Sequence, residues 1–350
     1  MKHILLLFIL ALAGCAGLHS MPPKNYSHTD DESTYRVFFD QYGDLYPSSS
    51  EAIMPERKTF GRNYAFSIRT YMKNTNQEYN ENTIEAHYSK LVSSISDKMN
   101  KQSKLVLLIH GFNNSYEEAN LSFEYIKSHL NSKSDSKFIF IEVYWDGLFK
   151  GPFSSPLPLA YWFDSLTYSN IAGQVGLRKL LNRLPHNTNL TIITHSRGAG
   201  VAFSAISNPV YDKHIIVPEF EDYAGDNISS LNIVAIAPAV GNGHPLGDPS
   251  SILNQNSRVF IGFNENDPAL QKSKVGSGKF GDTSLGTDNK FYLKAEKLAN
   301  VQHLTLQRVV YENYNEHGIR GYIDLQAQTD CLFWAANLFN DQPQNCSLSR

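Results

Sequence analysis

The sequence has little cysteine and no strong charge of either sign. Only 3 of the 350 residues are cysteines, which excludes a disulfide-dense scaffold. Lys and Arg number 31 against 34 Asp and Glu, so no basic field indicates a nucleic-acid partner. The apolar share of 41% is too high for a disordered chain. We therefore expect a globular protein of one or two domains with a substantial core.

Sequence signals for metals and bound phosphates are also missing. There is no CxxC pair, no HExxH motif and no GxxxxGK[ST] loop. The Gly-rich stretch 274–289 does not have the order of a phosphate loop, and we expect it to be a surface loop. The sequence therefore predicts a protein without a metal or another cofactor.

The N-terminus has the pattern of an export signal. A basic start precedes ten apolar residues, 4–13, about half of the ~20 that a membrane-spanning helix needs. The residues Leu-Ala-Gly-Cys at 12–15 resemble the lipoprotein signal of bacteria. That resemblance implies a signal peptide over 1–14 and an acylated, palmitate-bearing Cys15. Because Ala16 rather than Asp follows, it also implies the periplasmic face of the outer membrane. The alternative is an ordinary signal peptide with an incidental cysteine.

The two remaining cysteines are Cys331 and Cys346. Two spare thiols in an oxidising compartment tend to pair, so we expect a disulfide that holds the C-terminal tail. A loop of this size is worth ~3 kcal/mol in chain-entropy models. The alternative is two free thiols.

The rest of the chain alternates apolar runs with helix-like segments. We interpret residues 15–34 as a polar tether and 35–350 as a single domain. The predicted strands are 104–109, 137–145, 189–194, 231–237 and 257–263, and the predicted helices are 115–130, 168–184 and 198–206. This alternation predicts an α/β fold with a mostly parallel sheet covered on both faces. Segment 207–230 does not fit the alternation and is predicted to be an irregular insertion.

One strand-to-helix junction has the pattern of a nucleophile elbow. Ser196 follows the strand 189–194 and precedes the helix 198–206, and Gly198 and Ala199 keep the turn small. Such a turn exposes the serine hydroxyl at the sheet edge. The free N–H groups of the helix N-terminus then face any negative charge that develops there.

Two motifs resemble the α/β-hydrolase superfamily, and within it a group of largely uncharacterised bacterial hydrolases. His-Gly-Phe-Asn at 110–113 follows one strand, and His-Ser-Arg-Gly at 195–198 follows another. The likeness covers roughly residues 100 to 340, and it departs where Thr194 replaces the usual first glycine of the elbow. It implies an α/β-hydrolase fold with loop insertions. It also implies an oxyanion hole made by the backbone N–H groups of Phe112 and Arg197.

The chain order of this fold, serine then acid then histidine, selects the acid. The strand 257–263 ends in an Asn-Glu-Asn-Asp-Pro turn that positions Asp267, our predicted acid, with Glu265 as the alternative. His110 ends a strand before the serine, so we interpret it as structural. Asp146, at the end of another strand, could line the pocket or brace a loop.

The same order leaves two candidate bases. His317 lies in a turn-like loop ahead of a C-terminal helix, and His303 lies in an apolar stretch. We predict His317 as the base, with His303 as the alternative. His214 and His244 come too early to leave room for an acid on a later strand.

Together these features predict an exported, lipid-anchored serine hydrolase. It would cleave carboxylic esters, of small molecules or lipids, through a Ser196–His317–Asp267 triad and an acyl-enzyme. One alternative is a catalytically inactive hydrolase fold that acts in binding at the envelope. Another is an amidase or thioesterase with the same residues. The Pro-rich segment 151–161 could form one wall of an acyl pocket or a surface loop.

Overall fold

A computed structural model describes most of the chain. The described residues are 21–29, 33–55, 66–100, 102–147, 158–211, 213–241, 257–272, 283–301, 304–312 and 314–349. The predicted signal peptide 1–14, Cys15, His244 and His303 lie outside the described residues, as do most of the segments 151–161 and 274–289.

The fold is built on a seven-stranded sheet in the order β1-β3-β2-β4-β5-β6-β7, and every neighbouring pair is parallel. The strands are Thr34–Phe39 (β1), Ser103–Ile109 (β2), Lys137–Trp145 (β3), Thr188–His195 (β4), Ile228–Ile236 (β5), Ser257–Phe263 (β6) and Thr305–Val310 (β7). The predicted α/β class with a parallel sheet is confirmed. The prediction missed the two outer strands, β1 and β7.

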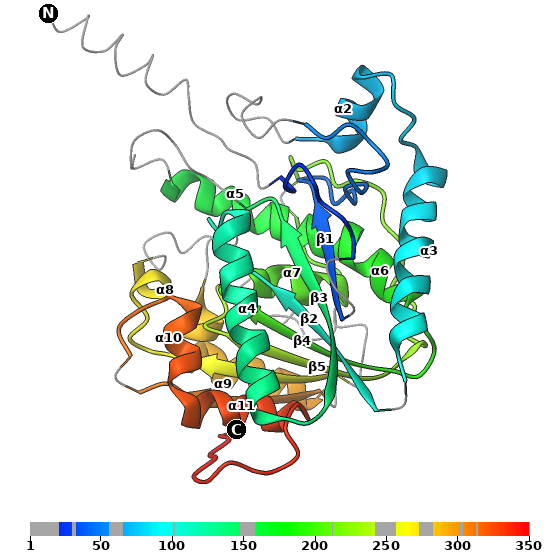
Figure 1. The fold of residues 1–350 in the computed structure, drawn as a ribbon. Coiled ribbons are helices and arrows are strands. Elements are labelled where there is room, and N and C mark those ends of the chain that lie inside the picture. The colour runs from blue at the N-terminus through cyan, green and yellow to red at the C-terminus, as the bar shows by residue number, and fades with distance from the viewer. Residues whose placement is uncertain are drawn as a thin grey trace, which may run out of the picture.

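Helices cover both faces of the sheet (Figure 1). On one face lie α4, α10 and α11, and on the other lie α5, α6 and α7, with α3 packed against α6. The bounds are Ile68–Asn74 (α2), Glu81–Lys98 (α3), Tyr116–Lys133 (α4), Pro158–Ile171 (α5), Ala172–Leu177 (η1), Arg178–Arg183 (α6), Gly198–Ala205 (α7), Pro268–Lys272 (α8), Ser284–Gly286 (η5), Asn289–Val301 (α9), Ile319–Asp324 (α10) and Gln326–Ala335 (α11). None of these helices is long and apolar enough to cross a membrane.

The strand order places a crevice beside β2. The chain leaves β2 for β3 on one side, then returns to β4 on the other side, so that Ile109 pairs with Thr194. The loops that follow β2 and β4 therefore start side by side and lead to opposite faces. In open parallel sheets, ligands bind at such a reversal, beyond the carboxyl ends of the strands.

The predicted tether 15–34 is wrong over its described part. Met21 and Tyr26 are buried in the core, and Thr34 begins β1. The Tyr26 ring packs against Phe38 at 4.8 Å between centroids, and its hydroxyl donates to the Arg36 carbonyl at 2.8 Å. The segment was predicted to be a tether because its composition is mostly polar, but the side chains of Met21 and Tyr26 pack into the core.

The predicted helix 168–184 is part of a longer helical segment that begins at Pro158 and contains the π-helix η1. Glycine is required inside that π-helix. A Cβ on Gly173 would lie 2.3 Å from the Val201 carbonyl oxygen, so the missing side chain lets this segment pack directly on α7.

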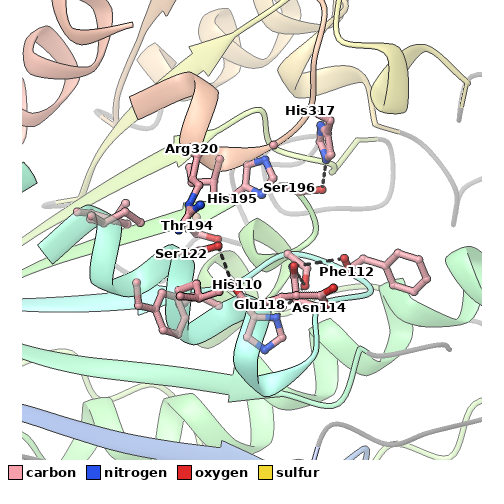
Figure 2. Close-up of a pocket in the computed structure, with 18 residues that line it drawn as sticks. His110, Phe112, Asn114, Glu118, Ser122, Thr194, His195, Ser196, His317 and Arg320 are labelled. Carbon is pink, nitrogen blue, oxygen red and sulfur yellow. Dashed lines mark hydrogen bonds between the residues drawn. The ribbon is translucent and has the colours of Figure 1, made fainter. Parts of the chain in front are cut away.

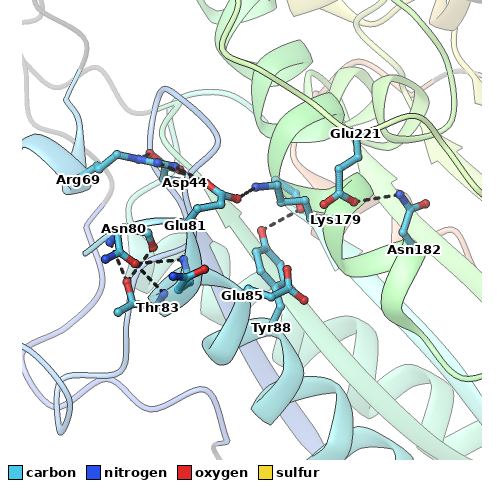
Figure 3. A network of polar contacts seen from close by, with 12 residues as sticks. Asp44, Arg69, Asn80, Glu81, Thr83, Glu85, Tyr88, Lys179, Asn182 and Glu221 are labelled. Atoms are coloured by element: carbon cyan, nitrogen blue, oxygen red, sulfur yellow. Dashed lines mark hydrogen bonds and ion pairs between the residues drawn. The ribbon is translucent and has the colours of Figure 1, made fainter. Parts of the chain in front are cut away.

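Ion pairs join the N-terminal helices to α6 (Figure 3). Glu81 of α3 binds Lys179 and Arg69, and Arg183 of α6 binds both Glu85 and Glu221 at 2.6 Å. Such partly exposed pairs contribute at most about 1 kcal/mol each. They fix where α3 lies rather than supplying the stability of the core.

The C-terminal tail is pinned at two points. A disulfide joins Cys331 of α11 to Cys346, as predicted, with the Cα atoms 5.0 Å apart. Backbone hydrogen bonds of 3.0 Å in both directions join Arg308 of β7 to Ser349. The tail therefore returns to β7, the outer strand of the sheet.

Candidate active site

Ser196 occupies the sharp turn between β4 and α7. Its φ of 54° is left-handed, a strained conformation for a residue with a Cβ. The turn is held because the Ser196 N–H donates to the Ile236 carbonyl at 3.0 Å. A Cβ on Gly198 would lie 2.4 Å from the His110 carbonyl oxygen, so only glycine fits there. The local geometry is that of the predicted nucleophile elbow.

His317 bridges Ser196 and Asp267. Its Nε2 lies 2.8 Å from Ser196 Oγ, and its Nδ1 lies 2.7 Å from Asp267 Oδ2. A carboxylate accepts hydrogen bonds, so Nδ1 carries the proton in the neutral ring and Nε2 is left to accept from the serine. The structure thus brings together the three residues selected from the sequence, although they come from three separate loops.

Asp267 is fully buried and fully bonded. Its Oδ1 accepts from the backbone N–H groups of Ala269 and Leu270, both at 3.0 Å, and so caps α8. Its Oδ2 accepts from His317 and from the Tyr322 hydroxyl at 2.6 Å. Burial alone would raise the pKa of Asp267, but the bonds from His317 and Tyr322 outweigh it and lower that pKa. The carboxyl group is therefore an anion.

Tyr322 was missed in the sequence. Its hydroxyl also accepts from Asn264 Nδ2 at 2.9 Å, so it links the turn after β6 to α10. The available signal is spacing: Tyr322 lies five residues after His317, about one helical turn into the element that follows the histidine loop.

The loop after β2 is braced by its own polar groups. His110 Nε2 accepts from the Trp145 N–H at 3.1 Å, so its Nδ1 donates to the Gly111 carbonyl at 2.8 Å. Burial lowers the pKa of His110 to about 4, which keeps the ring neutral. Asn114 Nδ2 also donates to the Gly111 carbonyl, at 3.1 Å. His110 thus holds the loop and makes no ring hydrogen bond to Ser196.

Phe112 and Arg197 lie on either side of the serine, one in the loop after β2 and the other next to Ser196 in sequence. The Phe112 ring packs edge-on against Trp162 at 5.2 Å, and the Arg197 guanidinium lies over the same indole at 4.1 Å. Arg197 also donates to the Ala239 carbonyl. These contacts fix the two segments whose backbone N–H groups are predicted to bind an oxyanion, a role that stays a prediction.

The alternative residues lie elsewhere. The side chain of Glu265 is exposed, and so is that of His214 in the insertion. Asp146 is buried and is absent from the lining of the cavity beside Ser196. Among the residues that the structure describes, no group of His, Cys, Asp and Glu could hold a metal ion.

Comparison with models of protein families shows to which family the chain belongs. Residues 86–282 match the model of a family described as "Alpha/beta hydrolase of unknown function (DUF900)". The chain belongs to this family of α/β hydrolases. The matched range contains Ser196 and Asp267 and ends before His317. No curated protein matches the chain significantly in sequence.

Solved structures with a similar fold include three named esterases or cutinases. A carboxylesterase of Bacillus cereus is 13% identical, with 69% of this chain and 91% of that chain covered and a TM-score of 0.34. A truncated carbohydrate esterase from gut microbiota is 11% identical (69% and 88% covered, TM-score 0.35). A Trichoderma reesei cutinase is 14% identical (67% and 92% covered, TM-score 0.26). These likenesses are weak, and the fold assignment rests on the family and the sheet.

A cavity of about 390 Å³ opens beside Ser196 in this α/β hydrolase (Figure 2). Its volume is within the usual range for small-molecule sites. Most of its lining is apolar and comes from β2, β4, α4 and α10. The lining residues are Ile109, His110, Gly111, Phe112, Asn114, Glu118, Leu121, Ser122, Phe123, Ile126, Ile193, Thr194, His195, Ser196, His317, Gly318, Ile319 and Arg320.

His195 forms part of this wall, with its ring centroid 4.7 Å from that of His317. Burial and the neighbouring His317 lower the pKa of His195 to about 3. Its ring is therefore neutral at physiological pH, and it adds no positive charge beside His317.

Proposed function

We propose that this α/β hydrolase is a serine hydrolase that cleaves carboxylic esters through an acyl-enzyme. The observation that carries the proposal is the chain of hydrogen bonds from Ser196 through His317 to Asp267, at 2.8 and 2.7 Å. This is the arrangement of nucleophile, general base and orienting acid that activates a serine hydroxyl.

The reaction would proceed in two halves. His317 Nε2 takes the Ser196 proton while Oγ attacks the acyl carbonyl, and the same nitrogen then gives that proton to the departing alkoxide. Water, deprotonated by His317, next attacks the acyl-enzyme and releases the carboxylic acid and the free serine. Asp267, an anion with its Oδ2 on Nδ1, stabilises the imidazolium in both halves.

The oxyanion of each tetrahedral intermediate needs donors beside Ser196. We assign these donors to the backbone N–H groups of Phe112 and Arg197, at the loop after β2 and the N-cap of α7. A preorganised donor of this kind contributes about 3 kcal/mol to transition-state binding.

The cavity favours an ester with an apolar group. Next to Ser196 its wall contains Ile109, Phe123, Ile126 and Ile193, four side chains that are buried or nearly so. An alkyl or aromatic acyl group would bury apolar surface there, at about 25 cal/mol per Å². The hydrogen bond between His317 and Ser196 supports this enzymatic reading over that of an inactive binding scaffold, which has no need of it.

Labelling with a fluorophosphonate tests the serine assignment in the full-length chain. The wild type should be labelled, and Ser196→Ala should not be, because the probe bonds to the activated hydroxyl. His317→Ala should lose labelling while His303→Ala keeps it, which separates the predicted base from its alternative. Labelling that persists in Ser196→Ala would exclude the proposed nucleophile.

A series of p-nitrophenyl esters from acetate to palmitate tests the ester class. Hydrolysis that depends on Ser196 and prefers an apolar acyl chain would support the proposal. If amide or thioester substrates are turned over faster than every ester, the machinery is that of an amidase or thioesterase instead.

Export and lipid anchoring remain proposals from the N-terminal sequence. We propose that residues 1–14 are removed and that Cys15 is acylated, which places the enzyme at the periplasmic face of the outer membrane. Metabolic labelling with a palmitate analogue in a bacterial host should mark the wild type and not Cys15→Ser. Equal labelling of both proteins would contradict the proposed lipid anchor at Cys15.

A further inference from the structure

A second cavity lies at the opposite end of the sheet from Ser196. It has a volume of about 740 Å³ and runs under the C-terminal tail, next to the amino ends of β2, β6 and β7. We call it the amino-edge pocket. Its lining residues are Lys104, Arg258, Phe260, Thr305, Gln307, Trp334, Ala335, Asn337, Phe339, Asn340 and Leu348.

The sheet register explains why polar residues gather on this face. Thr191, Asn232 and Arg258 are paired in one row across β4, β5 and β6, so their side chains point to the same face, where α11 ends. Thr191 and Asn232 both donate to the Ala336 carbonyl, and Lys104 donates to that of Leu338 at 3.1 Å. These bonds satisfy carbonyl groups at and beyond the C-terminus of α11.

Two positive charges in this pocket have no counter-charge among the residues that the structure describes. Neither Lys104 nor Arg258 forms an ion pair with any carboxylate in the described part of the chain, and no Asp or Glu lines the pocket. Arg258 uses its Nε on Asn232 Oδ1 at 2.9 Å, which leaves the outer edge of the guanidinium to the pocket. Burial alone lowers the pKa of Lys104 and of Arg258, because no anion offsets it.

The other lining groups are amides and aromatic rings. The side chains of Gln307, Asn337 and Asn340 form no hydrogen bond with another described residue, so both their donors and their acceptors are available. Trp334 and Phe339 also line the pocket. Amides that both donate and accept suit vicinal hydroxyl groups, and aromatic faces suit the C–H face of a sugar ring. A guanidinium suits a carboxylate or phosphate.

We propose that the amino-edge pocket binds a small sugar that carries a carboxylate or phosphate group. Arg258 would hold the anionic group, Trp334 would pack against the ring, and the Lys104 ammonium would donate to a hydroxyl group at the far end of the sugar. The two cations lie on strands three positions apart, roughly 14 Å between backbones. The cavity of about 740 Å³ that they line has room for a mono- or disaccharide. The site needs neither Ser196 nor the proposed ester hydrolysis.

Calorimetric titration of the full-length Ser196→Ala chain tests the site, because no turnover can occur there by the proposed mechanism. The probes are D-glucuronate, glucose 6-phosphate, glucose and inorganic phosphate. We expect at least one anionic sugar to bind about tenfold or more tightly than both glucose and phosphate. The ratio between glucuronate and glucose 6-phosphate identifies which anion is preferred. Failure of both anionic sugars to bind, or glucose or phosphate binding as tightly, would overturn the proposal.

Variants connect that binding to the pocket. Arg258→Gln should weaken the binding of the anionic sugar by about tenfold or more, and Arg258→Lys by less, because the charge remains. Lys98→Gln, an exposed lysine at the end of α3, is the control and should change nothing. If Arg258→Gln does not fold, Lys104→Gln and Trp334→Ala should each weaken binding in its place. Unchanged affinity in the folded variants would place the sugar elsewhere and overturn the assignment.

Discussion

At the carboxyl edge of the sheet, polar groups satisfy one another. Asp267 accepts from His317, from Tyr322 and from two backbone N–H groups, and His317 reaches Ser196. At the amino edge, Lys104 and Arg258 face a cavity in which no described residue supplies a neutralising carboxylate. An arrangement complete in itself is suited to moving a proton along a fixed path. An arrangement that lacks one charge is suited to receiving a ligand that brings it.

We expect the largest effect from removing the charge of Asp267 at the carboxyl edge, and this change should leave the amino edge unaffected. Asp267→Asn should lower kcat by about 10⁴-fold, because the amide favours the wrong imidazole tautomer. Ester hydrolysis measures it, and Glu265→Gln is the matched control because that side chain is exposed. Binding of D-glucuronate at the amino-edge pocket should not change. A stronger loss of activity in Glu265→Gln than in Asp267→Asn would move the acid to the alternative position.

Removing the disulfide tests the opposite edge. Cys331→Ser with Cys346→Ser should reduce the free energy of unfolding by about 3 kcal/mol, since the loop spans 15 residues. Urea titration measures that loss. The tail residues Asn337 and Asn340 line the amino-edge pocket, so the affinity for D-glucuronate should fall while fluorophosphonate labelling of Ser196 in the folded protein keeps its rate. Labelling that slows in parallel would mean that the edges are coupled.

A smaller effect is expected from the hydrogen bond that the sequence did not disclose. Tyr322→Phe removes one donor from the Asp267 carboxylate, and a bond to a charged group is worth about 1.5–3 kcal/mol. We expect kcat/KM for ester hydrolysis to fall by about tenfold or more. Tyr311→Phe is the control, because that hydroxyl bonds to Thr329 and not to the triad. Equal losses in both variants would indicate a general packing defect.

The last expected effect is gradual and concerns pH. Burial lowers the pKa of His110 from 6.5 to about 4, so as pH falls below 6.5 the unfolded chain binds the proton first. The free energy of unfolding should therefore decrease by about 1.4 kcal/mol per pH unit between pH 6.5 and 4 on account of this residue. His110→Gln should remove that part of the slope in urea titrations, and exposed His186→Gln should leave it. Identical slopes in all three proteins would contradict the assignment.

The sequence pointed to those parts of the candidate site that lie in contiguous patterns. A strand, a sharp turn and a helix disclosed Ser196, and chain order with a turn motif selected Asp267 and His317. Each of these signals is local, because the backbone must take a particular path at that point. The strand β6 was predicted with its observed bounds for a similar reason, since its apolar run is continuous.

Features made by contacts between distant segments were not predicted. Tyr322 reaches Asp267 only because α10 packs beside the turn after β6. Met21 and Tyr26 were assigned to a polar tether because most of their neighbours in the sequence are polar, yet both side chains are buried. The amino-edge pocket depends on the register of β4, β5 and β6, which places Thr191, Asn232 and Arg258 in one row. Composition and spacing contain no information on that register.

The four hydrogen bonds on Asp267 limit the orientational freedom of its carboxylate during the proposed reaction. Both oxygens are held, one as the cap of α8 and the other by His317 and Tyr322, so the carboxylate has no other orientation to adopt. Its rotational entropy is given up when the chain folds, and none is left to lose when the imidazolium forms. The acid of the proposed triad is thus preorganised, and the barrier to the proposed ester cleavage should contain no term for its rearrangement.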